Sequence, residues 1–156
     1  MSSTESQPTR DSRVSLREIN GDTVRTICRL SVHENQTSFV APNALSIAQG
    51  HFSDFAWFRA IYADETPVGF VMLEEQPEKP EYYVWRLMID ARWQGLGFGR
   101  RAMELIVERV RTLPNATELL TSVVQEEGGP QRFYEHLGFE LTGEYEDGEA
   151  MMCLKL

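Results

Sequence analysis

Residues 92–100 read RWQGLGFGR, and the segments on either side indicate which local structure this run forms. Before it, residues 82–89 (YYVWRLMI) are almost continuously apolar, as expected for a central strand covered on both faces. After it, Phe98, Ala102 and Leu105 begin an apolar stripe at helical spacing, and Pro114 stops that helix. The sequence therefore predicts a glycine-rich turn between a central strand and an amphipathic helix.

Gly95, Gly97 and Gly99 lie at the start of the predicted helix. The first turn of a helix leaves backbone N–H groups unpaired and carries partial positive charge, so it can hold a phosphate. Glycine lets phosphate oxygens approach the main chain, because no Cβ stands in the way. The turn is thus a candidate anion site.

Two common phosphate-binding patterns do not match this turn. A dinucleotide fingerprint needs G-x-G-x-x-G with an acidic residue about 20 positions on, whereas the spacing here is G-x-G-x-G. A nucleoside triphosphate loop needs G-K-[S/T], which is absent. The alternative interpretation, in which the turn only packs a strand against a helix and binds no phosphate, remains open at this point.

Apolar periodicity and turn residues divide the rest of the chain into short elements. The order β-α-α-β-β-β-α-β-α-β-β predicts one α/β domain with a mixed sheet. We expect strands at 14–19, 57–63, 67–74, 82–89, 118–124, 139–144 and 150–156, and helices near 24–32, 43–51, 98–113 and 130–137.

Composition narrows the class of protein. The chain has 156 residues, enough for one domain, and a formal charge of -9, which disfavours nucleic acid and favours cationic partners. No apolar run is long enough for a membrane span, and no signal-peptide core is present. The two isolated cysteines and three scattered histidines lack the spacing of metal ligands, so no metal site is predicted. Two free thiols also favour a location in the reducing cytoplasm. Residues 1–12 are polar and are expected to form a flexible tail before a domain at 13–156.

Two motifs resemble those of the GCN5-related N-acetyltransferase (GNAT) family. Residues 94–99 (QGLGFG) match its coenzyme A signature Q-x-x-G-x-G, and residues 132–139 (RFYEHLGF) resemble its Y-x-x-x-G-F hallmark after the next strand. The resemblance covers residues 14–156. It implies a single domain with a central, mixed but mostly antiparallel sheet of about six or seven strands, about four helices, and acetyl transfer from acetyl-CoA to an amine.

The resemblance also implies roles for particular residues. The backbone of Leu87, Met88 and Ile89 would pair with the pantetheine arm of acetyl-CoA, Tyr134 would act as general acid toward the thiolate, and Arg132 would lie near the coenzyme's tail. The pyrophosphate would be held by the backbone of Gln94, Gly95, Leu96, Gly97, Phe98, Gly99 and Arg100. Residues 125–130 (QEEGGP) depart from the family pattern, which leaves one coenzyme contact to backbone or to Gln125.

For the acceptor, the chain resembles the diamine and polyamine (spermine/spermidine) acetyltransferase branch at residues 33–40, 86–90 and 127–130. Carboxylates would bind the distal ammonium of such a substrate and take a proton from the reacting one. Glu34 and Glu75 are the leading pair, with Tyr83 and Trp85 as walls for the aliphatic chain. Further acids in the same segments are Asp54, Glu74 and Glu81.

Other functions fit the same motifs. The acceptor could be a protein N-terminus, a lysine or another small amine; the domain could bind acyl-CoA without catalysis, or be purely structural. The thioester is already activated, so no metal is expected. Relatives are often dimers, and we expect a homodimer in which residues 150–156, taken as an exposed strand, pair across a two-fold axis.

Overall fold

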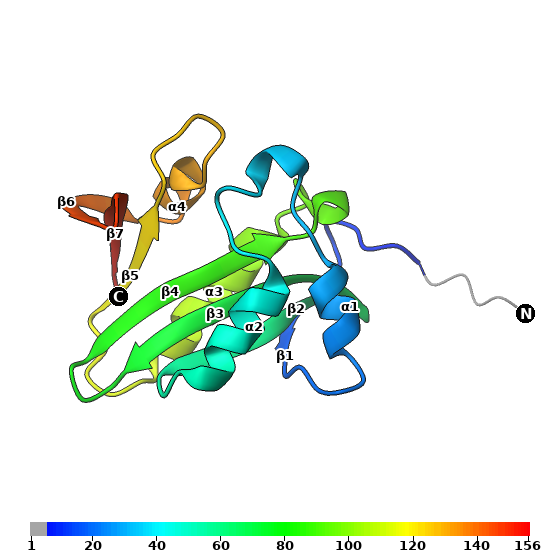
Figure 1. Ribbon diagram of the computed structural model, residues 1–156, viewed down its shortest axis with the longest axis horizontal. Helices are drawn as coiled ribbons and strands as arrows, with labels where there is room; N and C mark the ends of the chain where they lie inside the picture. The colour runs from blue at the N-terminus through cyan, green and yellow to red at the C-terminus, as the bar shows by residue number, and fades with distance from the viewer. Residues whose placement is uncertain (1–5) are drawn as a thin grey trace, which may run out of the picture.

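The computed structural model describes residues 6–156. Seven strands form one sheet in the order β1-β2-β3-β4-β5-β7-β6 (Figure 1). The strands are β1 (Val14–Arg17), β2 (Ala56–Ala63), β3 (Thr66–Gln76), β4 (Glu81–Ile89), β5 (Glu118–Val123), β6 (Glu140–Glu146) and β7 (Glu149–Lys155). All neighbours are antiparallel except β4 and β5. The predicted mixed, mostly antiparallel sheet is confirmed.

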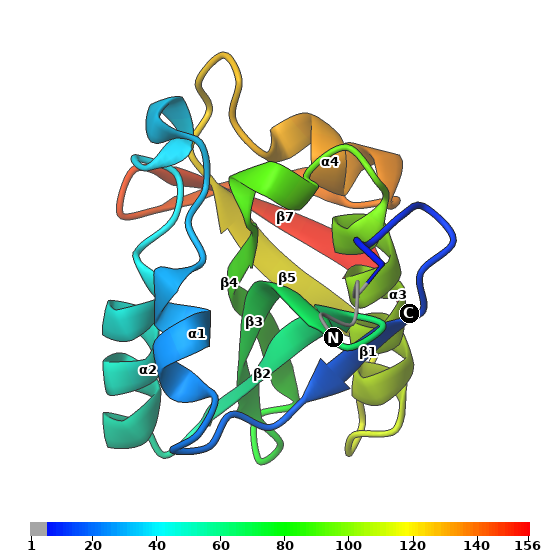
Figure 2. The same ribbon diagram turned by 90° about the vertical axis from the view of Figure 1, so that its right-hand side faces the viewer.

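Four α-helices cover the two faces of the sheet (Figure 2). α1 (Val24–Arg29) and α2 (Asn43–Phe52) lie on one face, and α3 (Phe98–Arg111) lies on the other. α4 (Gln131–His136) packs into the same apolar core as α3. Two short 3-10 turns, η1 (Glu34–Gln36) and η2 (Ala91–Trp93), precede α2 and α3.

α3 owes its place to the apolar stripe that the sequence predicts. Its buried side chains recur every three or four residues, so they share one helix face. They are Phe98, Ala102, Met103, Ile106 and Val110. The stripe packs on β3, β4 and β5, whereas α1 and α2 form a second core with the opposite face of the sheet.

Hairpin turns appear where turn chemistry predicts them. Asp64 has φ 51°, between β2 and β3. Asp147 and Gly148 have φ 50° and 81°, so both central residues of the β6–β7 turn are left-handed, as a type I′ hairpin requires. The aspartate-glycine pair thus fixes the register of the final hairpin.

β7 is not an edge strand, and the expectation that it pairs across a dimer axis is wrong. β7 hydrogen-bonds β5 on one side and β6 on the other, so its backbone groups are already paired. The exposed edge at this end is β6, every residue of which is exposed. Homodimerisation itself stays a prediction.

Residues 6–12, part of the expected tail, lie against the domain. Pro8 and Ser12 are buried, and the Thr9 N–H donates to the Ser12 hydroxyl oxygen at 2.9 Å. Arg101 of α3 donates to the Ser12 carbonyl at 2.5 Å. The remainder of that tail, residues 1–5, lies outside the described residues.

No helix within residues 6–156 combines the length and apolar character that crossing a membrane requires.

Candidate active site

A cavity of about 1200 Å³ opens where β4 and β5 part. The two strands pair at only two positions, Tyr83 with Leu120 and Val84 with Thr121. Beyond Val84, β4 stays paired with β3 but not with β5. The register of β3 and β4 shifts at Trp85, a bulge that places the Trp85 and Arg86 side chains in the cavity lining.

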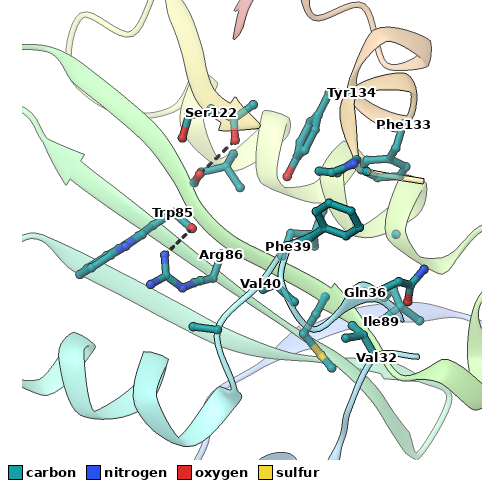
Figure 3. A pocket seen from close by; sticks show the side chains of 18 of the residues that line it. Val32, Gln36, Phe39, Val40, Trp85, Arg86, Ile89, Ser122, Phe133 and Tyr134 are labelled. Atoms are coloured by element: carbon teal, nitrogen blue, oxygen red, sulfur yellow. Dashed lines mark hydrogen bonds between the residues drawn. The ribbon is translucent and has the colours of Figure 1, made fainter. Parts of the chain in front are cut away.

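Three walls enclose this cavity (Figure 3). β4 contributes Trp85 and Arg86, and α4 contributes Phe133 and Tyr134. The segment between η1 and α2 supplies the third wall, with Phe39 opposite α4. The cavity therefore gathers residues from segments far apart in the sequence.

The glycine turn forms one end of the cavity. Gly95 and Gly97 have φ 80° and 83°, and a Cβ built on either would meet no protein atom within 4 Å. The Arg101 N–H donates to the Gly97 carbonyl, so the amides before Arg101 are those of the unpaired first turn of α3. Open space against free amides fits the pyrophosphate of a coenzyme, as the spacing of the glycines predicts.

The arginines near this turn have different partners. Arg92 pairs with the buried Asp90 at 2.8 Å. Arg101 donates to the carbonyls of Leu96 and Ser12. Arg100 lines the cavity and makes an i,i+4 pair with an exposed glutamate at 3.4 Å, so its guanidinium is the one available to a phosphate.

Gln94 supports the turn through its side chain. Its Nε2 donates to the Ile89 carbonyl at 2.9 Å and to Gln36 Oε1 at 2.9 Å, and Gln36 Nε2 donates back to Gln94 Oε1 at 3.2 Å. The glycine turn is thereby tied to the end of β4 and to η1. This accounts for a glutamine at the start of the motif.

Most predicted coenzyme residues line the cavity. On β4 these are Leu87, Met88 and Ile89, whose edge toward β5 is left unpaired. In and after the turn they are Gln94, Gly95, Gly97, Phe98, Gly99 and Arg100. The side chain of Leu96 packs against the core, and neither Leu96 nor the exposed Arg132 belongs to the lining.

The loop that departs from the family pattern contributes backbone. Gly128, Gly129 and Pro130 line the cavity. Gln125 is outside the lining, where it accepts from the Tyr145 hydroxyl at 3.0 Å. Backbone and Gln125 were the two groups expected to make the coenzyme contact that this departure leaves open, and the structure brings only the backbone to the cavity.

Tyr134 enters the cavity from α4 with its hydroxyl directed away from the helix (Figure 3). The side chain is 6% exposed and its ring packs edge-on against Phe133 and Phe139, each with centroids 5.2 Å away. Burial raises the pKa of the Tyr134 phenol well above its usual value, although hydrogen bonding with Thr121 acts in the opposite direction. Tyr134 is therefore a protonated donor throughout the physiological range.

The structure does not bring the two leading acids together. Glu34 is exposed in η1 and outside the cavity lining. Glu75 faces α3, where Arg109 holds it with two hydrogen bonds of 2.8 and 2.9 Å. Its neighbour Glu74 points to the other face, opposite Tyr83, and lines the cavity. Because side chains alternate along a strand, Glu75 forms an ion pair on one face of the sheet while its neighbour Glu74 lines the cavity on the other.

The part of the cavity around Tyr83, away from the glycine turn, is the part expected to take the amine, and it is called the acceptor half below. Its lining contains several carboxylates and the guanidinium of Arg86. The acids are Glu74, Glu81, Glu146, Asp147 and Glu149. The last three come from the β6–β7 hairpin, where no motif in the sequence points to the site. Tyr83 and Trp85, expected as walls, both line this half.

Tyr83, Ser122 and Glu149 form a hydrogen-bonded chain across three strands. The Tyr83 and Ser122 hydroxyls are hydrogen-bonded, and the Ser122 hydroxyl donates to Glu149 Oε2 at 3.2 Å. Burial raises the pKa of the Tyr83 phenol, the Ser122 hydrogen bond opposes this, and the charges of Glu149 and Glu146 add to it. The chain is not visible in the sequence because its members lie on β4, β5 and β7.

Arg86 is the cation of the acceptor half. It donates to the Trp85 carbonyl and, at 3.2 Å, to Gln49 Oε1, while its buried Nε has no partner among residues 6–156. Burial lowers the pKa of Arg86, and the charges of Tyr83 and Glu149 oppose that shift. A buried guanidinium with a free N–H can accept an anionic group.

Residues 6–156 contain no group of three or more histidine, cysteine, aspartate or glutamate side chains arranged to hold a metal ion.

Comparisons with known proteins agree with this geometry. The model of the Acetyltransferase (GNAT) family matches residues 16–139. The spermine/spermidine N(1)-acetyltransferase of Bacillus subtilis is 25% identical over 150 residues, covering 92% of this chain and 99% of that protein. An L-2,4-diaminobutyric acid acetyltransferase of Streptomyces avermitilis is 34% identical over 73 residues, covering 45% of this chain and 41% of that protein.

The fold is shared with solved acetyltransferases. The spermidine N-acetyltransferase of Vibrio cholerae, in complex with CoA and spermine, superposes with a TM-score of 0.72 at 19% sequence identity. The match covers 91% of this chain and 95% of that one.

Proposed function

This chain belongs to the Acetyltransferase (GNAT) family and is an N-acetyltransferase, and we propose that it moves an acetyl group from acetyl-CoA to a primary amine of a small polyamine or diamine. The reaction takes place by direct attack of the amine on the thioester while both substrates are bound. We place this reaction in the cytoplasm, in keeping with the unpaired cysteines.

The acidic acceptor half carries this proposal. Five carboxylates and one guanidinium line it, so it favours a molecule with several positive charges. Tyr83 and Trp85 offer aromatic faces to the methylene chain and ammonium groups of such a substrate. A relative named for spermine and spermidine, matched over nearly its whole length, points to the same class.

The donor half suits acetyl-CoA, which supplies an acyl group already activated as a thioester. The amides at the start of α3 and Arg100 would hold the pyrophosphate, and the open edge of β4 from Leu87 to Ile89 would pair with the pantetheine amides. Tyr134 would donate a hydrogen bond, and finally a proton, to the sulfur as negative charge develops there.

Among the acids, those in the cavity suit the acceptor. Glu74 and Glu81 can reach a distal ammonium from β3 and β4. Glu34 is exposed and Glu75 is paired with Arg109, so either side chain would have to move into the cavity to act as the general base for the amine. We therefore assign binding of the distal ammonium to Glu74 and Glu81.

A second candidate acceptor is a diamine that also carries a carboxylate. Arg86 favours it, because its unpartnered Nε is buried in the lining of the acceptor half. The partial match to a diaminobutyric acid acetyltransferase points to the same class.

The test is a measurement of kcat/KM with acetyl-CoA against a panel of amines. The panel comprises spermidine, spermine, putrescine, 2,4-diaminobutyrate, a monoamine of similar length and a peptide with a free N-terminus. We expect the polyamines to give the highest kcat/KM; a higher value for 2,4-diaminobutyrate would favour the second candidate. Preference for the peptide, or CoA binding without turnover of any amine, would contradict the proposal.

A further inference from the structure

The reacting ammonium must lose a proton before it can attack, and neither Glu34 nor Glu75 reaches the cavity to take it. We propose that Tyr83, Ser122 and Glu149 form a proton relay in which Tyr83 accepts that proton and Glu149 stores it. This inference rests on the proposed function, because it assigns the base of the same reaction.

The direction of the hydrogen bonds follows from the number of protons available. A carboxylate only accepts, so the one hydroxyl proton of Ser122 is given to Glu149 Oε2, at 3.2 Å. Ser122 Oγ must then accept from the Tyr83 hydroxyl. A lone pair on the Tyr83 oxygen is left for a donor in the cavity, which all three residues line.

The step balances in protons and electrons. An N–H bond of the ammonium breaks and its proton passes to the Tyr83 oxygen, while the Tyr83 proton passes to Ser122 and the Ser122 proton to Glu149. The amine nitrogen keeps the electron pair and becomes the nucleophile, and Glu149 becomes a neutral carboxylic acid. When the amide forms, Tyr134 gives its proton to the thiolate sulfur. The nitrogen then loses its second proton, which returns to Tyr134, and Glu149 releases its proton to solvent.

The surroundings of Tyr83 favour this transfer. In water an ammonium is a far weaker acid than a carboxylic acid, so the step is unfavourable there. Attack of the neutral amine on the thioester draws the transfer forward, because it consumes the amine as it forms. Burial also raises the pKa of the Tyr83 phenol, which keeps it protonated so that it can pass one proton on as it takes another.

Several charged or titratable groups surround the relay. Glu146 and Glu149 come from the β6–β7 hairpin, Arg86 from β4 itself and Tyr134 from α4. Glu74 is the cross-strand neighbour of Tyr83 on β3. A cation entering among these acids would be attracted by them, whereas only Tyr83 is hydrogen-bonded to a chain that leads the proton away.

The experiment compares Tyr83→Phe with Tyr82→Phe. Tyr82 is adjacent on β4 but faces α3, where its hydroxyl donates to the Pro114 carbonyl, so this control loses a hydroxyl outside the cavity. Acetylation of spermidine is measured from about pH 6.5 to 9.5, together with KM for both substrates. The best acceptor of the panel replaces spermidine if it is a different amine.

We expect Tyr83→Phe to lower kcat about 100-fold near pH 7, with KM for acetyl-CoA unchanged. The defect should shrink as the pH approaches the pKa of the amine, about 10, because solution then supplies the neutral amine. Tyr82→Phe should keep the wild-type pH profile. A Tyr83→Phe enzyme with wild-type kcat, or with a defect of equal size at every pH, would overturn the relay.

Glu149→Gln separates the relay from simple attraction of a cation, with Glu144→Gln on exposed β6 as its matched control. The relay predicts a loss in kcat with the same rescue at high pH, whereas attraction alone predicts a rise in the amine KM at unchanged kcat. The second result would overturn the relay. A wild-type protein that acetylates no amine in the panel would overturn the proposed function as well, while an active wild type with unaffected variants would remove the relay alone.

Discussion

Tyr134 has two roles, one in the apolar core and one in the cavity. The α4 helix must pack its ring into the core, and the same ring must present a hydroxyl to the cavity. Phe133 and Phe139 enclose the ring at 5.2 Å each, which fixes its orientation and excludes water. The packing that buries Tyr134 is also the cause of its raised pKa, so the structure keeps the donor protonated.

Tyr134→Phe tests this role. The ring and its packing are preserved, so we expect kcat to fall by about 100-fold or more while CoA affinity stays close to wild type. Because the pKa of Tyr134 is raised, the wild-type rate should show no loss from tyrosine ionisation up to about pH 10. Steady-state kinetics and CoA titration by calorimetry give the two quantities. An unchanged kcat would remove Tyr134 from the mechanism.

Asp90 is the buried carboxylate that ends β4. Burial alone would raise its pKa, but hydrogen bonds from the Arg92 side chain and from the Ser31 and Arg92 amides outweigh this, and the pKa is lowered. A pKa lowered by folding adds stability above the unfolded value of about 4, and that stability is lost as the pH falls.

We therefore expect Asp90→Asn to destabilise the protein by about 2 kcal/mol at neutral pH. The difference in the free energy of unfolding between the variant and the wild type should shrink as the pH falls below about 4, because protonation then makes the wild-type carboxyl neutral as well. Urea unfolding at a series of pH values measures both. Asp54→Asn, at an exposed position, is the control and should leave the free energy of unfolding unchanged at every pH.

At the scale of elements, the start of α3 and the open edge of β4 form one continuous backbone surface. β4 parts from β5 after Val84, and only Asp90 and the short η2 turn separate β4 from the glycine turn. Gln94 holds the two together through the Ile89 carbonyl and joins them to η1 through Gln36. Both surfaces that we propose for acetyl-CoA therefore consist of main chain, and one side chain holds them together.

Gly97→Ala tests the glycine turn. A non-glycine residue at φ 83° is strained, so we expect a loss of about 1 kcal/mol in stability, and the new Cβ would enter the space assigned to the pyrophosphate. Affinity for CoA should fall at least tenfold. Gly143→Ala is a matched control, because Gly143 has φ 88° and equally open surroundings on β6. It should lose similar stability and keep CoA affinity; equal CoA affinity in both variants would contradict the assignment of the turn.

For the molecule as a whole, charge is distributed to suit one substrate of each sign. The net charge is -9, and carboxylates of β3, β4 and the β6–β7 hairpin gather around the acceptor half. The helix amides and Arg100 at the opposite end are the groups that we propose to hold the anionic coenzyme. Under this proposal the cavity separates a site for an anion from a site for a cation.

Salt should affect the two substrates differently. Raising NaCl from about 0.05 to 0.5 M shortens the screening length to a few ångström, so we expect KM for spermidine to rise several-fold. KM for a monoamine of similar length should change less, because fewer charges are screened. Initial rates at fixed, saturating acetyl-CoA measure this; equal salt dependence for the two amines would argue against an acidic acceptor site.

Local signals were enough to predict the elements. Apolar periodicity located α3 and the central strands, turn chemistry located the Asp147-Gly148 hairpin, and the glycine spacing located the turn before α3 for which phosphate binding stays a prediction. These features depend on residues close together in the chain. The fold class follows from their order.

The acceptor half depended on contacts between distant segments. Residues 67–74 are apolar on both faces, so no alternation in the sequence reveals that Glu74 faces the cavity and Glu75 faces Arg109. Glu149 reaches Ser122, and through it Tyr83, only because β7 inserts between β5 and β6, a non-local pairing without a local signal. The sequence by itself thus predicts the glycine turn as an anion site, whereas strand pairing and the packing of each sheet face select the side chains that line the rest of the cavity.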